Sequence, residues 1–189
     1  SAIYNYFTKD DEVLPETISI NLNRSANLRY GENPHQDAAF YLPKGKSVTW
    51  QQHQGKTLSY NNYADMESAF NIPLEFSEIA CAIIKHANPC GFGLGKNPKE
   101  AYLRAVTTDP VSYFGGIVGF NREVDVETAE ELIQPFLECI IAPSFDAAAL
   151  EILKRKKNLR TISVGEVGLQ DNYFIKSVAG GYLYQQKDT

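Results

Sequence analysis

Short apolar segments that alternate with amphipathic helical segments constrain this chain more than any other feature of its sequence. The apolar segments lie at residues 79–84, 114–120, 139–142 and 159–164. The helical patterns lie at residues 63–76, from 97 onward, from 125 onward and at 145–155. Apolar runs without strict alternation are typical of strands that are covered on both faces. The sequence therefore predicts an α/β domain with a largely parallel or mixed sheet and helices on its faces.

Capping residues mark the expected helix starts. Asn62 and Asp125 are each expected to cap the helix that follows them, because their side chains can accept a backbone N–H of the first turn. Asn97 followed by Pro98 is typical of another helix start. Residues 1–7 are apolar enough to be the tail of a further helix.

Turn-forming residues separate the expected strands. Residues 38–42 and 47–51 are expected to pair as a hairpin around a Pro-Lys-Gly-Lys turn. The glycine-rich residues 91–95 predict a flexible loop. Further strands are expected at residues 18–30, 173–175 and 182–184.

Composition is ordinary for a globular protein and excludes several classes. Hydrophobic residues make up 43% and charged residues 22% of 189 residues, which fits one domain or a large piece of a bigger protein. A net charge of -5 argues against coating of nucleic acid, and no apolar run reaches the ~20 residues of a membrane span. Cys81, Cys90 and Cys139 have no paired spacing, which predicts reduced thiols and a cytoplasmic location. Residues 1–7 lack a basic n-region and do not look like a signal peptide.

The pair Lys85-His86 is the first candidate for chemistry. It follows an uncharged apolar segment, and residues 88–91 (Asn-Pro-Cys-Gly) are expected to form the turn that ends the strand. Ligands of α/β sheets bind at the carboxyl ends of strands, where adjacent titratable side chains can transfer protons. Taken alone, the pair also fits a strand that simply meets solvent.

A zinc site is not expected at this pair. A strand-end His followed by Pro-Cys is similar to the zinc-deaminase pattern H-x-E…P-C-x-x-C. Asn88 stands where that pattern has Glu, and Gly93 stands where it has the second Cys. His35 and His53 are too isolated in sequence to complete a metal site.

A polar cluster between residues 29 and 36 is the second candidate. Arg29 suits bidentate binding of phosphate, and Tyr30 can stack on a heterocycle. Asn33, His35 and Gln36 can satisfy the polar edges of a ring. This density of hydrogen-bonding side chains exceeds that of a usual solvated turn, although an ordinary polar loop is the simpler alternative.

Three further residues could contact a ligand. Gly115 permits close approach of the backbone to a ligand, and the neighbouring Phe114 could face a flat ring. Glu138 could bind ligand hydroxyls, or it could be a solvated residue at the end of a helix. The basic run at residues 154–157 is expected to be a solvated helix end.

These segments resemble one family, in order along the chain. They are LRYGENPHQ (28–36), LSYNN (58–62), KHANPCG (85–91), FGGIV (114–118) and IIAP (140–143). They are similar to the formyltransferase domain of the bifunctional aminoimidazole carboxamide ribonucleotide (AICAR) transformylase/IMP cyclohydrolase family. The resemblance covers nearly the whole chain from Leu28 on.

The resemblance implies a reaction and roles for residues. A formyl group would pass from the co-substrate 10-formyltetrahydrofolate to the exocyclic amine of the nucleotide. His86 would accept the amine proton, and Lys85 would stabilise the oxyanion or help to protonate the folate leaving nitrogen. Arg29 and Tyr30 would bind the nucleotide.

The same resemblance assigns the remaining contacts. Phe114 and Gly115 match a Phe-Gly pair that contacts the ring. Glu138 falls where some members carry an Asp that contacts the nucleotide.

The resemblance also implies the domain organisation. The expected fold is a metal-free, cytidine-deaminase-like layered sheet, of which residues 13–189 would be the first of two subdomains. Residues 1–12 would be a linker or the tail of a preceding cyclohydrolase domain. The parent protein would be a homodimer, and this fragment is expected to have little or no activity alone.

Two alternatives remain open at this point. One is a non-catalytic nucleotide-binding or assembly module, which would use Arg29 and Tyr30 but would not need Lys85 and His86. The other is a zinc deaminase, which metal analysis would test.

Overall fold

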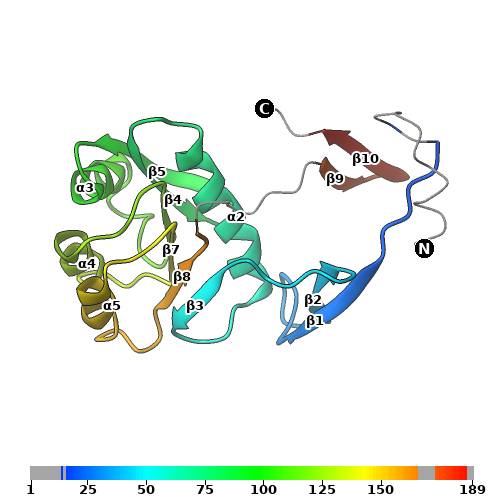
Figure 1. Cartoon of the computed structure of the whole chain (residues 1–189), viewed down its shortest axis with the longest axis horizontal. Coiled ribbons are helices and arrows are strands. Elements are labelled where there is room, and N and C mark those ends of the chain that lie inside the picture. Colours follow the sequence, from blue (N-terminus) through cyan, green and yellow to red (C-terminus); the bar gives the residue numbers. More distant parts are fainter. Residues whose placement is uncertain (1–13, 15, 166–172, 187–189) are drawn as a thin grey trace.

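The chain folds around a six-stranded mixed sheet with helices on both faces (Figure 1). The computed structural model describes residues 14, 16–165 and 173–186. Its elements, in chain order, are β1 (Leu22–Leu28), β2 (Ala38–Pro43), β3 (Gln51–Gln54), α2 (Tyr60–Leu74), β4 (Ile79–Lys85), β5 (Asn88–Gly95), α3 (Pro98–Thr108), β6 (Ile117–Phe120), α4 (Val126–Leu132), β7 (Cys139–Ala142), α5 (Ala147–Leu153), β8 (Arg160–Ser163), β9 (Tyr173–Val178) and β10 (Gly181–Gln186).

The strand order of the large sheet is β3-β8-β7-β6-β4-β5. β6, β7 and β8 run parallel to one another, and the helices α4 and α5 connect them. β4 is antiparallel to both of its neighbours, β5 and β6, and β3 is antiparallel to β8. The mixed α/β sheet predicted from the sequence is therefore confirmed.

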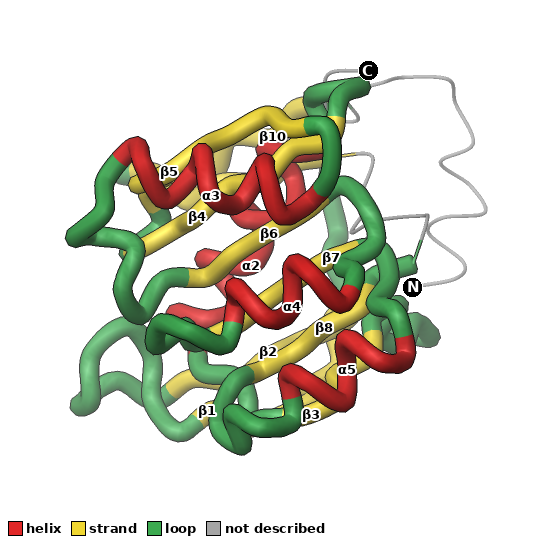
Figure 2. Tube along the Cα trace, turned by 90° about the vertical axis from the view of Figure 1, so that its left-hand side faces the viewer, coloured by secondary structure: helices red, strands yellow, loops and turns green. Residues whose placement is uncertain are grey.

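Helices α3, α4 and α5 cover one face of the sheet and α2 covers the other (Figures 1 and 2). Successive residues of β4 alternate between the two layers: Cys81 and Ile83 pack into the core with α3–α5, and Ala82 and Ile84 into the core with α2. All four are fully buried. Burial on both faces explains why this strand reads as a continuous apolar run rather than an alternating one.

The predicted flexible loop at residues 91–95 is wrong, because these residues belong to strand β5. Gly91, Gly93 and Gly95 recur at every second position and face α3. A Cβ atom at Gly93 would lie 2.4 Å from the Ala101 carbonyl oxygen, well inside van der Waals contact. The glycines therefore permit close packing of β5 against α3 rather than flexibility.

The predicted hairpin between residues 38–42 and 47–51 is also wrong. β2 pairs with β1, from Leu22↔Pro43 to Leu28↔Ala38. The chain then crosses to the large sheet, where β3 pairs with β8. The two strands expected near the C-terminal end are confirmed as the antiparallel pair β9–β10, joined next to Gly180.

The predicted helix caps are confirmed at two sites and corrected at a third. Asn97 accepts a hydrogen bond from the Glu100 N–H, and Asp125 accepts one from the Thr128 N–H. The helix α2 begins earlier than expected, with Ser59 as its N-cap, and Asn62 is the partner of Ser59 in a capping box.

Three remaining expectations concern the first residues, the cysteines and membrane spans. The expected helical tail and linker at residues 1–12 lie outside the described residues. The three cysteines are free, two of them buried. None of the described helices is long and apolar enough to cross a membrane.

Candidate active site

One edge of the large sheet collects most of the predicted site residues. The strand register aligns Ile84 with Ile117, Ile117 with Cys139, and Cys139 with Arg160. Because β4 is antiparallel to β6, the carboxyl end of β4 lies beside the amino ends of β6, β7 and β8. Lys85 and Glu138, each one residue beyond this row of aligned residues, therefore lie at the same end of the sheet. This end, where β4 ends and β6, β7 and β8 begin, is called the sheet edge below.

Lys85 joins β4 to the turn that precedes β6. Its Nζ atom donates a hydrogen bond to the Phe114 carbonyl oxygen at 2.9 Å. The expected strand at residues 114–120 is shorter than predicted, since β6 begins at Ile117 and the Gly116 N–H closes a turn onto the Tyr113 carbonyl. The side chain of Lys85 is partly buried, and its contact fixes the turn at the sheet edge.

Phe114 and Gly115 are fixed by Phe136, which follows α4. Gly115 has a φ of +75°, a conformation that favours glycine, and its N–H donates to the Phe136 carbonyl at 2.8 Å. The Phe114 and Phe136 rings lie 5.4 Å apart between centroids. Phe114 is 57% exposed, so its ring is held in place yet open to a ligand.

His86 lies in the two-residue turn between β4 and β5. The turn was expected at residues 88–91, but those residues are part of β5, and His86 and Ala87 form the turn instead. Both have positive φ angles, +54° and +60°. The imidazole is exposed at the same edge as Lys85.

Two contacts hold this turn. The Ala87 N–H donates to Asp65 Oδ1 at 2.6 Å, and Asn88 Nδ2 donates to the His86 carbonyl at 2.9 Å. Asp65 lies in the second turn of α2, whose amino end therefore reaches the sheet edge.

Glu138 is anchored through one carboxylate oxygen. Asn62 Nδ2 donates to Glu138 Oε2 at 2.9 Å, and Arg160 Nη1 lies 3.6 Å from the same oxygen. The Arg160 side chain is 11% exposed and also donates to the Thr57 carbonyl. Among the described residues Glu138 Oε1 has no hydrogen-bond partner, and it can accept from a ligand hydroxyl.

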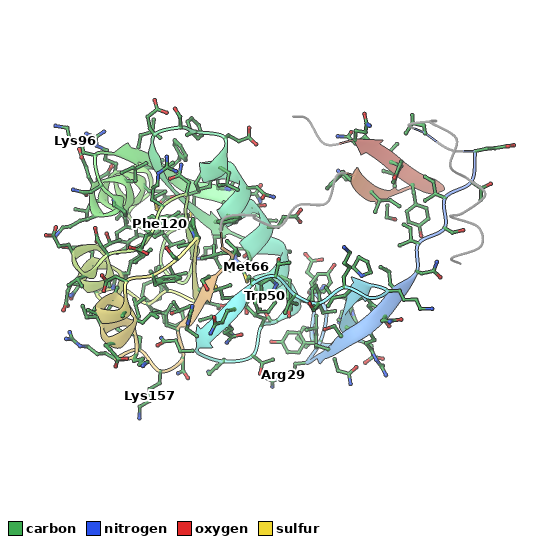
Figure 3. The ribbon with its side chains drawn as sticks, in the orientation of Figure 1. Arg29, Trp50, Met66, Lys96, Phe120 and Lys157 are labelled. Atoms are coloured by element: carbon green, nitrogen blue, oxygen red, sulfur yellow. The ribbon has the colours of Figure 1, made fainter. Side chains whose placement is uncertain are left out.

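Arg29, which is labelled in Figure 3, and Tyr30 follow β1, which belongs to a separate two-stranded sheet with β2. The Arg29 guanidinium carbon is 5.5 Å from the centroid of the Tyr30 ring. In the part of the chain that the structure describes, no hydrogen bond joins either residue to Lys85, His86 or Glu138. The structure thus brings together five of the seven predicted residues at one edge.

The loop after Tyr30 meets α2 but uses its own polar groups. Asn33 and Gln36 hydrogen-bond each other, with the Asn33 N–H donating to Gln36 Oε1 at 2.7 Å. These two side chains therefore close the loop, which accounts for part of the polar density seen in the sequence. Asn61 of α2 reaches the Glu32 carbonyl at 3.5 Å.

Comparison with known proteins decides the family. A family model described as AICARFT/IMPCHase bienzyme matches residues 1–189. The chain belongs to this family.

Curated relatives named bifunctional purine biosynthesis protein PurH agree with this family. The protein of Clostridium perfringens (strain SM101) is 46% identical over 191 residues, and that of Thermoanaerobacter sp. (strain X514) is 48% identical over 192. Each match covers 100% of this chain and 38% of the relative. The protein of Bacillus mycoides (strain KBAB4) is 49% identical over 193 residues, covering 99% of this chain and 38% of that protein. The chain thus spans 38% of the length of these relatives.

A solved structure, Acinetobacter baumannii RibD form 2, is weakly similar. Its TM-score is 0.38 at 16% identity, covering 44% of this chain and 28% of that one. A similarity of this size does not assign a fold.

Four residues that support the candidate site residues in this structure were not singled out as site residues in the sequence. They are the supports of the predicted ones: Asn62, Asp65, Phe136 and Arg160. For Asn62 the sequence predicts only a helix cap. Asn62 and Asp65 contact residues that lie 76 and 22 positions away in the chain, and no sequence pattern indicates partners at such distances.

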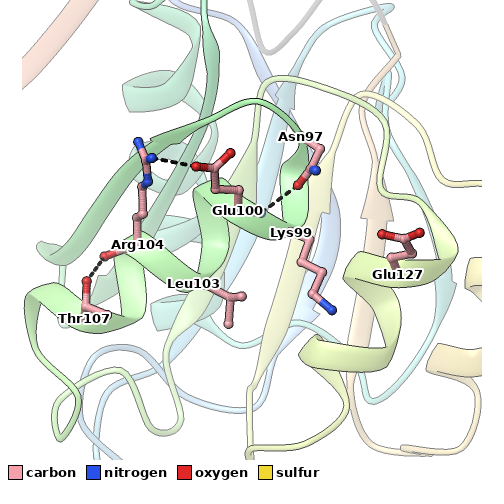
Figure 4. Close-up of a pocket in the computed structure, with 7 residues that line it drawn as sticks. All are labelled: Asn97, Lys99, Glu100, Leu103, Arg104, Thr107 and Glu127. Carbon is pink, nitrogen blue, oxygen red and sulfur yellow. Dashed lines mark hydrogen bonds and ion pairs between the residues drawn. The ribbon is translucent and has the colours of Figure 1, made fainter.

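Two further observations concern metal ligands and surface depressions. Within the described ranges no group of three or more His, Cys, Asp or Glu residues could hold a metal ion. An open depression of about 510 Å³ lies along α3 and α4 (Figure 4). It contains none of the predicted site residues, and its side chains are Asn97, Lys99, Glu100, Leu103, Arg104, Thr107 and Glu127.

Proposed function

We propose that this chain is the first deaminase-like subdomain of an AICAR formyltransferase. It would contribute to transfer of a formyl group from 10-formyltetrahydrofolate to the amine of AICAR in purine (IMP) synthesis. Membership of the AICARFT/IMPCHase family supports the reaction. The observation that carries the site is the convergence of Lys85, the Phe114-Gly115 turn and Glu138 at one sheet edge, with His86 on the adjoining turn.

The proposed chemistry is a direct acyl transfer. The amine nitrogen forms a bond to the formyl carbon, and the bond from that carbon to the folate nitrogen breaks. His86 takes the proton that the amine loses, and the departing folate nitrogen gains a proton. An exposed imidazole at the mouth of the site can meet the amine without a change in the fold.

Lys85 suits the complementary role. Its ammonium group has three N–H donors, and the Phe114 carbonyl uses one of them. The other two can donate to the oxygen that becomes negative in the transition state, or one can protonate the leaving nitrogen. The bond to Phe114 fixes the ammonium at the sheet edge, as this stabilisation requires.

The proposed binding residues divide between the β1–β2 hairpin and the edge of the large sheet. Arg29 and Tyr30 would bind the nucleotide from the β1–β2 hairpin, with Arg29 suited to its phosphate. Phe114 would contact the ring while Gly115 admits it closely, and Glu138 Oε1 would accept from a hydroxyl.

Other parts of the parent protein would complete the proposed site. Since the chain spans 38% of its PurH relatives, we propose that the parent is a cytoplasmic homodimer whose other parts complete the nucleotide and folate contacts. Residues 1–12 would link to a cyclohydrolase domain. The chain alone would then have little or no transferase activity, and no zinc would be needed.

Replacement of His86 in the full-length parent tests the catalytic role. We expect His86→Ala to lower kcat by about 10²–10⁴-fold, the usual contribution of a general base, with little change in the KM for the nucleotide. His53→Ala is the matched control, because His53 lies on the edge strand β3 and contacts Ser163. A rise in KM with unchanged kcat would contradict the catalytic role and favour a nucleotide-binding module.

A further inference from the structure

The turn that carries His86 has an unusual backbone. His86 and Ala87 have φ angles of +54° and +60°, in the left-handed region that residues with a Cβ atom avoid. Two-residue hairpin turns with positive φ at both central positions normally contain Asn and Gly. Such a conformation persists in other residues only where surrounding contacts hold it.

Asp65 connects the turn to a different element. Its Oδ1 atom accepts the Ala87 N–H at 2.6 Å. Asn88 also contacts the turn, through the His86 carbonyl, but Asn88 belongs to the same hairpin and moves with it. Among the described residues, Asp65 is therefore the residue whose hydrogen bond fixes the turn relative to α2.

The helix α2 is a rigid support for this carboxylate. Its first turn is closed by the capping box of Ser59 and Asn62. Met66, the residue after Asp65, is 2% exposed in the core beneath the sheet. The backbone of Asp65 is consequently fixed from both sides, and its side chain transmits that position to Ala87.

We infer that Asp65 is a positioning residue that sets the location of the His86 imidazole. This inference rests on the proposed function, in which His86 accepts the amine proton. Asp65 acts through the backbone, since no hydrogen bond between it and the His86 ring is present among the described residues. What the turn requires is a hydrogen-bond acceptor at this place, not a negative charge.

Three variants of the full-length parent protein separate these requirements. Asp65→Ala removes the acceptor, and we expect kcat to fall about 100-fold with a much smaller change in KM, since misplacing a catalytic group by about 1 Å can cost that much. Asp65→Asn keeps an oxygen at Oδ1 and should retain most of kcat. Glu67→Ala removes an exposed carboxylate two residues away on the same helix and is the matched control.

A second substitution tests whether Asp65 acts through the backbone of the turn. Glycine adopts the φ of Ala87 without the Cβ penalty. We therefore expect Asp65→Ala to lower kcat much less in an Ala87→Gly background than in the wild-type background. A purely structural role of Asp65 in α2 would give the same loss in both backgrounds.

Amide hydrogen exchange gives a readout that does not depend on activity. The Ala87 N–H should exchange faster in Asp65→Ala than in the wild-type protein and in Asp65→Asn. Wild-type kcat in Asp65→Ala, equal losses in Asp65→Asn and Asp65→Ala, or no relief by Ala87→Gly would each overturn the inference. Wild-type kcat in His86→Ala would instead overturn the proposed function, while the exchange result at Ala87 would stand.

Discussion

Replacement of Asn62 by alanine is expected to weaken the fold and the candidate site together. Asn62 is 2% exposed at the start of α2. Its Oδ1 atom accepts the Ser59 N–H at 3.0 Å, and its Nδ2 atom donates to Glu138 Oε2 at 2.9 Å. One side chain thus closes the first turn of the helix and orients the carboxylate that would contact the nucleotide.

The magnitude follows from these two hydrogen bonds. A neutral hydrogen bond contributes about 0.5–1.5 kcal/mol and one to a charged group about 1.5–3 kcal/mol. The Glu138 side chain is 43% exposed, so water replaces part of what its carboxylate loses and the lower half of the second range applies. We expect Asn62→Ala to lower the free energy of unfolding by about 2–4 kcal/mol. For a chain of this size that corresponds to a Tm lower by about 4–16 °C.

Two companion variants separate the contributions. Ser59→Ala removes only the oxygen that accepts the Asn62 N–H and should cost about 1 kcal/mol, the usual loss at an N-cap. Asn62→Asp keeps the acceptor for the Ser59 N–H but replaces the donor with a carboxylate that faces Glu138. It should destabilise more than Asn62→Ala at neutral pH, and the difference should shrink in acid as one of the two carboxyls gains a proton.

Urea unfolding of the chain, followed by circular dichroism, measures all three variants. The midpoints should shift while the slope m stays constant, since the surface exposed on unfolding is the same. A loss below about 0.5 kcal/mol for Asn62→Ala, within the range of an ordinary surface substitution, would refute the reasoning. Equal losses for Asn62→Asp and Asn62→Ala at neutral pH would show that the Glu138 contact is not formed in solution.

Two further predictions concern the packing of the core. Gly119→Ala should cost more than about 3 kcal/mol or prevent folding, because the added Cβ would lie 1.7 Å from the Ala69 carbonyl oxygen; Gly181→Ala, with open space around it, should change the unfolding midpoint little. Burial raises the pKa of Cys139 to about 12. Because that thiol ionises at a lower pH in the unfolded chain than in the folded one, its contribution to the free energy of unfolding should be fully present below about pH 8.5. That contribution should be lost as the pH rises toward 12. At pH 8 an alkylating reagent should label Cys90, which is partly exposed, before the other thiols, and faster labelling of Cys139 in the folded chain would contradict its burial.

Local chemistry made much of this fold predictable from the sequence. The caps Asn97 and Asp125 each bond a backbone N–H three residues away, so their signal lies within one helical turn. The apolar run at residues 79–84 defined β4 and placed Lys85 at its end. These features depend on neighbours in the chain, and sequence patterns record such neighbours well.

The errors came from contacts between distant residues. Gly91 and Gly93 favour a loop in the sequence, because the residue type alone does not distinguish flexibility from close packing. In the structure these glycines make room for the helix α3. β3 pairs with β8, which lies more than 100 residues later in the chain. The sequence pattern around β3 favours instead the nearer pairing with residues 38–42. The sequence does not single out Asp65, because its partner Ala87 becomes a neighbour only in the folded chain.

The candidate site depends on one antiparallel pairing within the sheet. If β4 ran parallel to β6, its carboxyl end would lie at the opposite edge, and Lys85 could not reach the Phe114 carbonyl. A shift of two residues between these strands would move Lys85 by about 7 Å, beyond hydrogen-bond distance. A shift of one residue would exchange the faces of Ile83 and Ile84, which pack into different cores. The same apolar residues that stabilise β4 therefore set the register on which the proposed catalytic pair depends.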